Sequence, residues 1–97
     1  MQFYNENLPG VEFIKKGLKD LKMKEETIES LLVSIASPRL IRLGFKIIDP
    51  YPDAENKLYR RLEKINPNNA HSQYNALIRR IVSFSRAYEN IYLPRDV

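Results

Sequence analysis

Apolar residues recur every three or four positions along most of the chain, which is the spacing of one face of an α-helix. The pattern predicts helices over residues 10–22, 25–36, 38–43, 53–65 and 70–91. The apolar stripes, in chain order, are Val11, Ile14, Leu18 and Leu21; Ile28, Leu31, Leu32 and Ile35; Leu40, Ile41 and Leu43; Leu58, Leu62 and Ile65; and Tyr74, Leu77, Ile81, Phe84, Tyr88 and Ile91. Residues 45–48 alternate weakly, but no second segment pairs with them as a strand. We therefore expect an all-α fold, a compact bundle of four main helices plus one short helix, with the long C-terminal helix as its spine.

Turn-forming residues separate the expected helices. Gly44 fits the left-handed position after the short third helix, and Asp53 fits the N-cap of the fourth helix. Residues 23–24 form a short turn, so the first two helices should pair as an antiparallel hairpin. Gly17 weakens the first helix by about 1 kcal/mol relative to alanine, and a glycine there indicates the close approach of another helix.

The chain has 97 residues, which is enough for one small domain. We expect residues 1–97 to form a single helical domain with flexible ends at about 1–8 and 92–97. Hydrophobic residues make up 43% and charged residues 29%, which argues against a disordered chain and against a membrane protein. The longest apolar run, residues 31–36, is far shorter than the roughly 20 residues that span a bilayer. The first residues also lack the pattern of a signal peptide.

The residue types limit the chemistry that the chain can perform. The absence of cysteine excludes disulfides, zinc–thiolate sites, iron–sulfur clusters and a thiol nucleophile, and it favours a reducing compartment, the cytoplasm. Glu25, Glu26 and Glu29 have oxygens suited to magnesium, but the dipole of the second helix accounts for them better. We expect no catalytic residue, no cofactor, no metal and no enzymatic activity. An enzyme would have to rely on His71, Arg79 and the nearby tyrosines.

Basic residues gather on predicted helix faces, and the formal net charge is +4. Such faces can bind phosphates or carboxylates, although a solvated helix surface is the simpler interpretation. The candidate anion or nucleic-acid contacts are Lys15, Lys19 and Lys22 on the first helix, Lys57, Arg60, Arg61 and Lys64 on the fourth, and Arg79 and Arg86 on the fifth. A helix-turn-helix would place Arg39 and Arg42 on its recognition helix, but the third helix is short and the turn lacks the usual glycine.

Several aromatic residues lie outside the main helical stripes, among them Phe3, Tyr4, Tyr51 and Tyr92. Tyrosine is enriched at protein interfaces. The leading hypothesis is therefore a small non-enzymatic protein-interaction module or assembly subunit, which binds a protein partner or associates with itself as a homodimer. The alternative is a nucleic-acid-binding protein that uses the basic helix faces. That alternative gains support if the faces of the first and fourth helices are coplanar, and loses support if the acidic second helix lies between them.

Overall fold

The computed structural model describes residues 8–92 and contains five helices and no strand in that range. Each helix predicted from the apolar spacing is present, so the all-α fold class is confirmed. The helices are α1 (Val11–Lys22), α2 (Ile28–Ile35), α3 (Ser37–Arg42), α4 (Ala54–Ile65) and α5 (Ala70–Tyr92). The predicted flexible ends fall almost entirely outside the described residues. Residues 8 and 92 are the exceptions: the Leu8 side chain is buried in the core, and Tyr92 is the last residue of α5.

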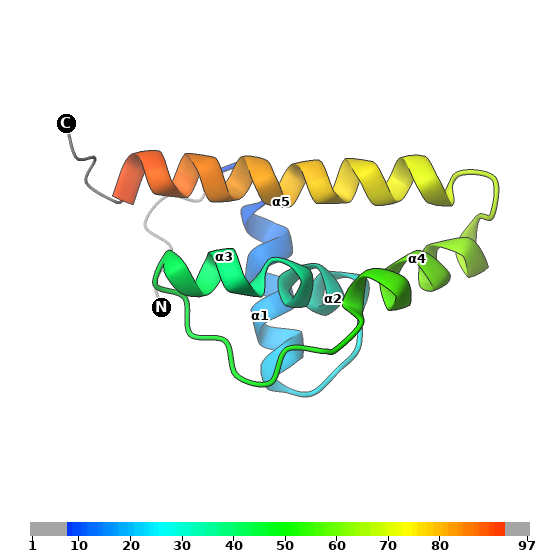
Figure 1. Cartoon of the computed structure of the whole chain (residues 1–97), viewed down its shortest axis with the longest axis horizontal. Helices are drawn as coiled ribbons and strands as arrows, with labels where there is room; N and C mark the ends of the chain where they lie inside the picture. Colours follow the sequence, from blue (N-terminus) through cyan, green and yellow to red (C-terminus); the bar gives the residue numbers. More distant parts are fainter. Residues whose placement is uncertain (1–7, 93–97) are drawn as a thin grey trace.

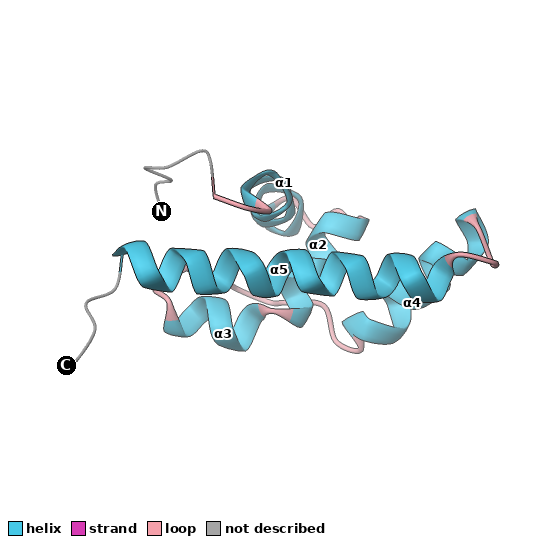
Figure 2. Ribbon diagram, turned by 90° about the horizontal axis from the view of Figure 1, so that it is seen from above, coloured by secondary structure: helices cyan, strands magenta, loops and turns pink. Residues whose placement is uncertain are grey.

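The longest helix, α5, lies above α2, α3 and α4 in Figure 1, and α1 runs nearly at right angles to it. Seen from above, α1 lies on one side of α5 and α3 on the other (Figure 2). The short helix α2 packs against α1, α3, α4 and α5. The long helix therefore spans the molecule as predicted, whereas the centre of its packing is α2.

The burial of α2 explains this central position. Leu31, Leu32 and Val33 are three consecutive residues that point in different directions around the helix axis, and none of them is exposed. Every residue of α2 is buried or half-buried, so the helix has to be covered on all sides. Its neighbours therefore pack around it rather than along one face.

A capping box sets the start of α2 later than predicted. The Thr27 hydroxyl accepts a hydrogen bond from the Ser30 amide at 3.1 Å, and the Ser30 hydroxyl accepts one from the Thr27 amide at 2.8 Å. Glu25 and Glu26 consequently precede the helix, and only Glu29 lies in its first turn. The expectation that all three glutamates begin this helix was wrong for the first two.

Gly17 lies where α1 and α2 come closest, as its position in the sequence predicted. A Cβ atom at this residue would collide with the carbonyl oxygen of Glu29 and with a methyl group of Val33, both on α2. The two helices do not form the predicted antiparallel hairpin. α1 is seen nearly end-on in Figure 2 whereas α2 runs across its side, so the pair is crossed.

Residues 45–48 remain extended, and Phe45 anchors them to the core. Its ring lies 4.9 Å from that of Tyr88 and 5.9 Å from that of Phe84, measured between centroids. Farther along the linker, the Tyr51 amide donates a 2.9 Å hydrogen bond to the buried hydroxyl of Ser34 on α2. These contacts fix the path of the connection between α3 and α4.

Three residues of the predicted apolar stripes are at least half exposed. Ile41 is 50% exposed, Ile65 is 65% and Ile91 is 52%, so their predicted burial was wrong. Ile65 is the last residue of α4, and Ile91 is the last but one of α5. At these helix ends the apolar spacing continues beyond the neighbouring helix that could cover it. None of the helices within residues 8–92 is both long enough and apolar enough to cross a membrane.

Candidate functional site

A groove opens between α1 and the extended residues that follow α3. It has a volume of about 520 Å³ and is called the lysine-rimmed groove below. Its lining consists of four aliphatic and four basic residues and contains no acidic residue: Leu18, Leu21, Ile47 and Ile48, with Lys15, Lys19, Lys22 and Lys46. Three of the predicted anion contacts, those of the first helix, therefore lie together.

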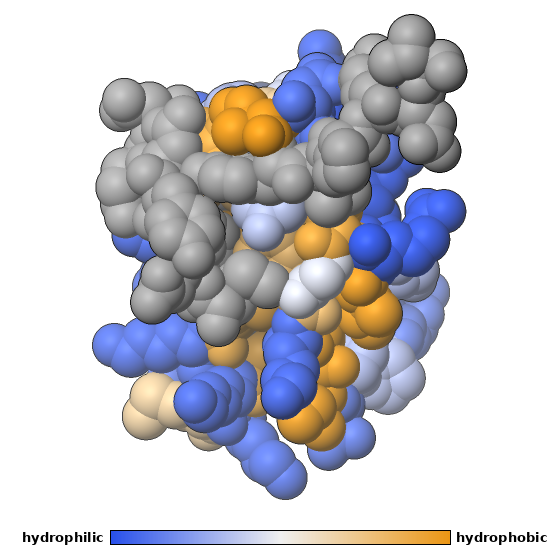
Figure 3. Space-filling model, turned by 90° about the vertical axis from the view of Figure 1, so that its left-hand side faces the viewer, coloured by the Kyte–Doolittle hydropathy of each residue, from blue (hydrophilic) through white to orange (hydrophobic). Residues whose placement is uncertain are grey.

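The apolar part of the groove is open to solvent. Leu21 is buried and Leu18 and Ile47 are partly buried, whereas Ile48 is 73% exposed, the highest value among the exposed large hydrophobic residues described. An isoleucine so exposed next to other aliphatic side chains leaves a patch of apolar surface in contact with water. Figure 3 views the end of the molecule where α3 and α5 finish, and it shows apolar surface between hydrophilic side chains.

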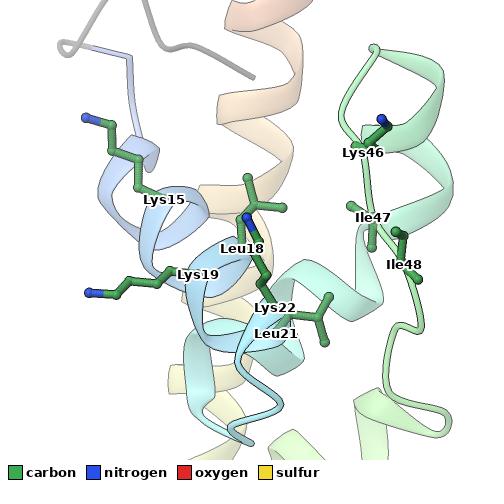
Figure 4. Close-up of a pocket in the computed structure, with 8 residues that line it drawn as sticks. All are labelled: Lys15, Leu18, Lys19, Leu21, Lys22, Lys46, Ile47 and Ile48. Carbon is green, nitrogen blue, oxygen red and sulfur yellow. The ribbon is translucent and has the colours of Figure 1, made fainter.

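The lysines occupy two positions relative to the apolar residues. In Figure 4, Lys22 lies beside Leu18 and Leu21, and Lys46 stands across the gap. Lys15 and Lys19 project from the opposite flank of α1. The sequence showed the α1 lysines as one face. It carried no signal for Lys46, Ile47 and Ile48, which only the fold brings beside α1.

The next basic residue of α1, Lys16, belongs to a different cluster. Its ammonium group donates a 2.6 Å hydrogen bond to the buried carboxylate of Asp20, which also accepts a 2.7 Å bond from the Thr27 hydroxyl. These two bonds hold the pKa of Asp20 below its ordinary value of 3.8, and the bond from Lys16 has the larger effect. The bond to Asp20 likewise raises the pKa of Lys16. The cluster ties α1 to the start of α2 and contributes no charge to the groove.

A second hollow, called the α4 basic hollow below, gathers all four predicted contacts of the fourth helix. It has a volume of about 410 Å³ and is lined by Lys57, Arg60, Arg61, Lys64, Ile65 and Glu26. Arg61 is tied to the segment before α2, because its guanidinium donates a 2.9 Å hydrogen bond to the carbonyl oxygen of Glu26 and lies 3.5 Å from the Glu26 carboxylate. The Lys57 ammonium lies 5.6 Å from the centre of the Tyr51 ring.

The two basic regions line separate grooves, which share no residue. α2 packs against both α1 and α4, and carboxylates of its first turn and of the preceding segment face each side. Glu29 lies 3.6 Å from the ammonium of Lys16, and Glu26 pairs with Arg61. The acidic residues at the start of α2 therefore separate the two basic faces, and this weakens the hypothesis of one nucleic-acid surface that spans α1 and α4.

The two predicted contacts of the fifth helix, Arg79 and Arg86, are exposed and do not share one hollow. Arg79 lines a third hollow of about 510 Å³ near the start of α1, and Arg86 is exposed but does not line it. Arg80 was not among the contacts predicted from the sequence; its guanidinium lies 5.2 Å over the Phe13 ring and 3.5 Å from the Glu12 carboxylate. His71 is exposed, and its ring lies 3.3 Å from the Asn75 amide nitrogen.

The structure gives little support to the other functional features considered from the sequence. Ala36 alone separates α2 from α3, whereas a helix-turn-helix needs a turn of about three or four residues. Phe3 and Tyr4 and the side chain of Tyr92 lie outside the described residues. Tyr51 is half-buried. Among residues 8–92, no group of three histidine or acidic side chains is arranged to hold a metal ion.

Comparison with known proteins adds no family to this description. No family model matches the chain, and no curated protein or solved structure matches it either. A functional interpretation therefore rests on the lysine-rimmed groove and the α4 basic hollow.

Proposed function

We propose that this chain is a small non-enzymatic protein-interaction module and that the lysine-rimmed groove binds an amphipathic, acidic segment of a partner protein. The supporting observation is the composition of the groove, in which four aliphatic side chains are combined with four lysines and no carboxylate. A module of this kind can also serve as an assembly subunit. The lack of cysteine suits work in a reducing compartment such as the cytoplasm.

The apolar residues supply the affinity in this proposal. Covering a fully exposed isoleucine contributes about 1.5–3 kcal/mol, and most of the Ile48 side chain is available to be covered. A partner helix reaches such a groove with apolar residues at positions i, i+3, i+4 and i+7. Leu18 and Ile47, which are partly exposed, extend the surface that those residues would contact.

The lysines supply orientation and speed of association. Lys15 and Lys22 are seven positions apart on α1, so the three lysines extend along about 10 Å of helix. Aspartate or glutamate residues on the flanks of the partner segment would face Lys22 and Lys46, which stand on the two sides of the gap, while Lys15 and Lys19 add positive charge on the far flank of α1. Charge complementarity of this kind raises the association rate and rejects basic partners, and salt weakens it.

Fluorescence anisotropy with a designed helical peptide tests the proposal. The peptide carries leucines at positions i, i+3, i+4 and i+7 and glutamates on both flanks, and its control has the same composition in scrambled order. We expect the patterned peptide to bind and the scrambled one to bind at least 10-fold more weakly. Replacing the flanking glutamates by lysine should abolish binding.

Matched variants of the protein assign the binding to the groove. Ile48→Glu should weaken binding of the patterned peptide by about 10-fold or more, since losing about 1.4 kcal/mol changes Kd tenfold. Ile91→Glu makes the same change at another half-exposed isoleucine and should leave binding unchanged. Equal loss in both variants, or no binding of the patterned peptide, overturns the proposal.

A second copy of the chain is the competing occupant of the groove. Sedimentation velocity on the protein alone distinguishes the two cases. A monomer at the concentrations of the peptide experiment is the expected result. A homodimer that Ile48→Glu dissociates would replace the foreign partner by self-association.

A further inference from the structure

The α4 basic hollow has a different character from the lysine-rimmed groove. Its lining contains one aliphatic residue, Ile65, against four cations and one carboxylate. That carboxylate, of Glu26, is already held by Arg61. Within residues 8–92, no carboxylate forms an ion pair with Lys57, Arg60 or Lys64. The hollow therefore offers four positive charges, with one aliphatic side chain and less apolar area than the lysine-rimmed groove.

We propose that the α4 basic hollow binds the phosphate backbone of nucleic acid, as a second site independent of the groove. An amphipathic acidic segment would find little to cover here except Ile65, whereas a polyanion needs no apolar surface. Phosphate contacts depend on lysine and arginine side chains, and guanidinium groups match phosphate oxygens with two parallel hydrogen bonds. The hollow contains two lysines and two arginines.

The spacing of the four cations agrees with this ligand. They occur at positions i, i+3, i+4 and i+7 of α4, so they share one side of the helix. From Lys57 to Lys64 the helix rises about 10 Å. One strand of duplex DNA carries a phosphate every 3.4 Å of its axis, so this length spans about three phosphates. The row can therefore neutralise about three charges along one strand.

The cations also repel one another in the unbound protein. Like charges three or four residues apart destabilise a helix, and four such pairs occur among these residues. A purely solvated helix face usually mixes both signs of charge. Phosphates bound in the hollow would relieve this repulsion. Removing positive charge here should consequently leave the fold at least as stable as before, while binding is lost.

The test is a salt titration with labelled nucleic acid and the intact chain. We would measure the Kd of a 20-base-pair DNA duplex and of a single-stranded RNA of 20 nucleotides by fluorescence anisotropy at several salt concentrations. For about three phosphate contacts on duplex DNA, log Kd should rise with log salt with a slope of about 3. The double variant Arg60→Gln/Lys64→Gln should lower that slope by about 2.

The matched control removes the same amount of charge from another helix. Arg79→Gln/Arg86→Gln acts on two exposed arginines of α5 and should leave the slope unchanged. An equal decrease of the slope in both double variants would mean that net charge alone attracts the nucleic acid, and it would overturn the proposal of a binding site on α4. Circular dichroism and thermal melting of Arg60→Gln/Lys64→Gln should match the unmodified chain, so that lost binding is not lost structure.

Two further outcomes would also overturn the proposal. One is the absence of nucleic-acid binding at 20 mM salt. The other is binding of the patterned acidic peptide that Arg60→Gln/Lys64→Gln weakens more than Ile48→Glu does, because the hollow would then be a protein site. The two sites are separable, since Ile48→Glu should bind the DNA duplex normally and Arg60→Gln/Lys64→Gln should bind the peptide normally.

Discussion

The contact between α1 and α2 at Gly17 allows a prediction with a definite sign. On an exposed helix surface, replacing glycine by alanine stabilises the helix by about 1 kcal/mol. At Gly17 the new Cβ would overlap the carbonyl oxygen of Glu29 and a methyl group of Val33, and it would lie 2.9 Å from the Glu29 carbonyl carbon. Ordinary contacts begin at 3.4 Å. Because the Glu29 atoms belong to the backbone of α2, no rotation of a side chain relieves the overlap.

The helices would have to move apart along a buried contact. Overpacking of a core typically lowers the free energy of unfolding by about 1–3 kcal/mol, and this loss exceeds the gain in helix propensity. We expect Gly17→Ala to lower the free energy of unfolding by about 2 kcal/mol. For a chain of this length the melting temperature should fall by roughly 8–16 °C. Urea unfolding followed by circular dichroism at 222 nm measures the first quantity, and a thermal scan measures the second.

A control and a double-mutant cycle separate the causes. Lys19→Ala changes an exposed residue of the same helix and should shift stability by less than about 0.5 kcal/mol. Val33→Ala removes one of the colliding groups, so Gly17→Ala should be less damaging in that background. If Gly17→Ala proves as stable as the unmodified chain or more stable, the close crossing of α1 and α2 is incorrect.

Three further predictions concern single side chains or turns. Asp20→Asn should lower stability by about 1–3 kcal/mol at neutral pH. Because hydrogen bonds lower the pKa of Asp20 in the folded state, the stability that Asp20 contributes is present above about pH 3.8 and is lost as the pH falls through the folded pKa. A loss of stability that is equal in urea titrations at pH 7 and at pH 2 would contradict this prediction. Ser34→Ala leaves the Tyr51 amide without its acceptor and should lower stability by about 1–2 kcal/mol in the same assay, whereas Ser85→Ala, which removes only a bond to the preceding helical turn, should have a smaller effect. Gly44→Ala, at a φ of 101° with no neighbour near the new Cβ, should lower stability by about 1–2 kcal/mol, and Gly44→Asn should be milder; equal melting temperatures for all three proteins would refute this.

The number, order and type of the helices could be predicted from the sequence because apolar spacing is a local property. Gly17 was also interpretable, since a glycine in the middle of an amphipathic helix weakens that helix and is typical of a point where another helix comes close. The late start of α2 was missed although its signal was local. Thr27 and Ser30 form a capping box in which serine replaces the usual glutamate or glutamine, so the pattern is easily overlooked.

The contacts that make up the site were harder to predict because they join distant parts of the chain. The apolar spacing does not mark Asp20 as a core residue, but its carboxylate is buried and accepts hydrogen bonds from Lys16 and Thr27. Lys46 and Ile48 lie more than twenty residues after α1, and no periodicity places them beside it. The separation of the two basic regions likewise depends on the position of α2, which apolar spacing does not determine.

The central position of α2 has a consequence for how the protein opens. Native-state hydrogen exchange reports the free energy needed to expose each amide, and helices at the edge of a fold exchange through small local openings. The amides of α2 lack such a route, because four other helices would have to separate before water reached Leu32 or Val33. Their exchange should therefore report the global free energy of unfolding, whereas amides near the exposed end of α5, at Ile91, should exchange well before that limit.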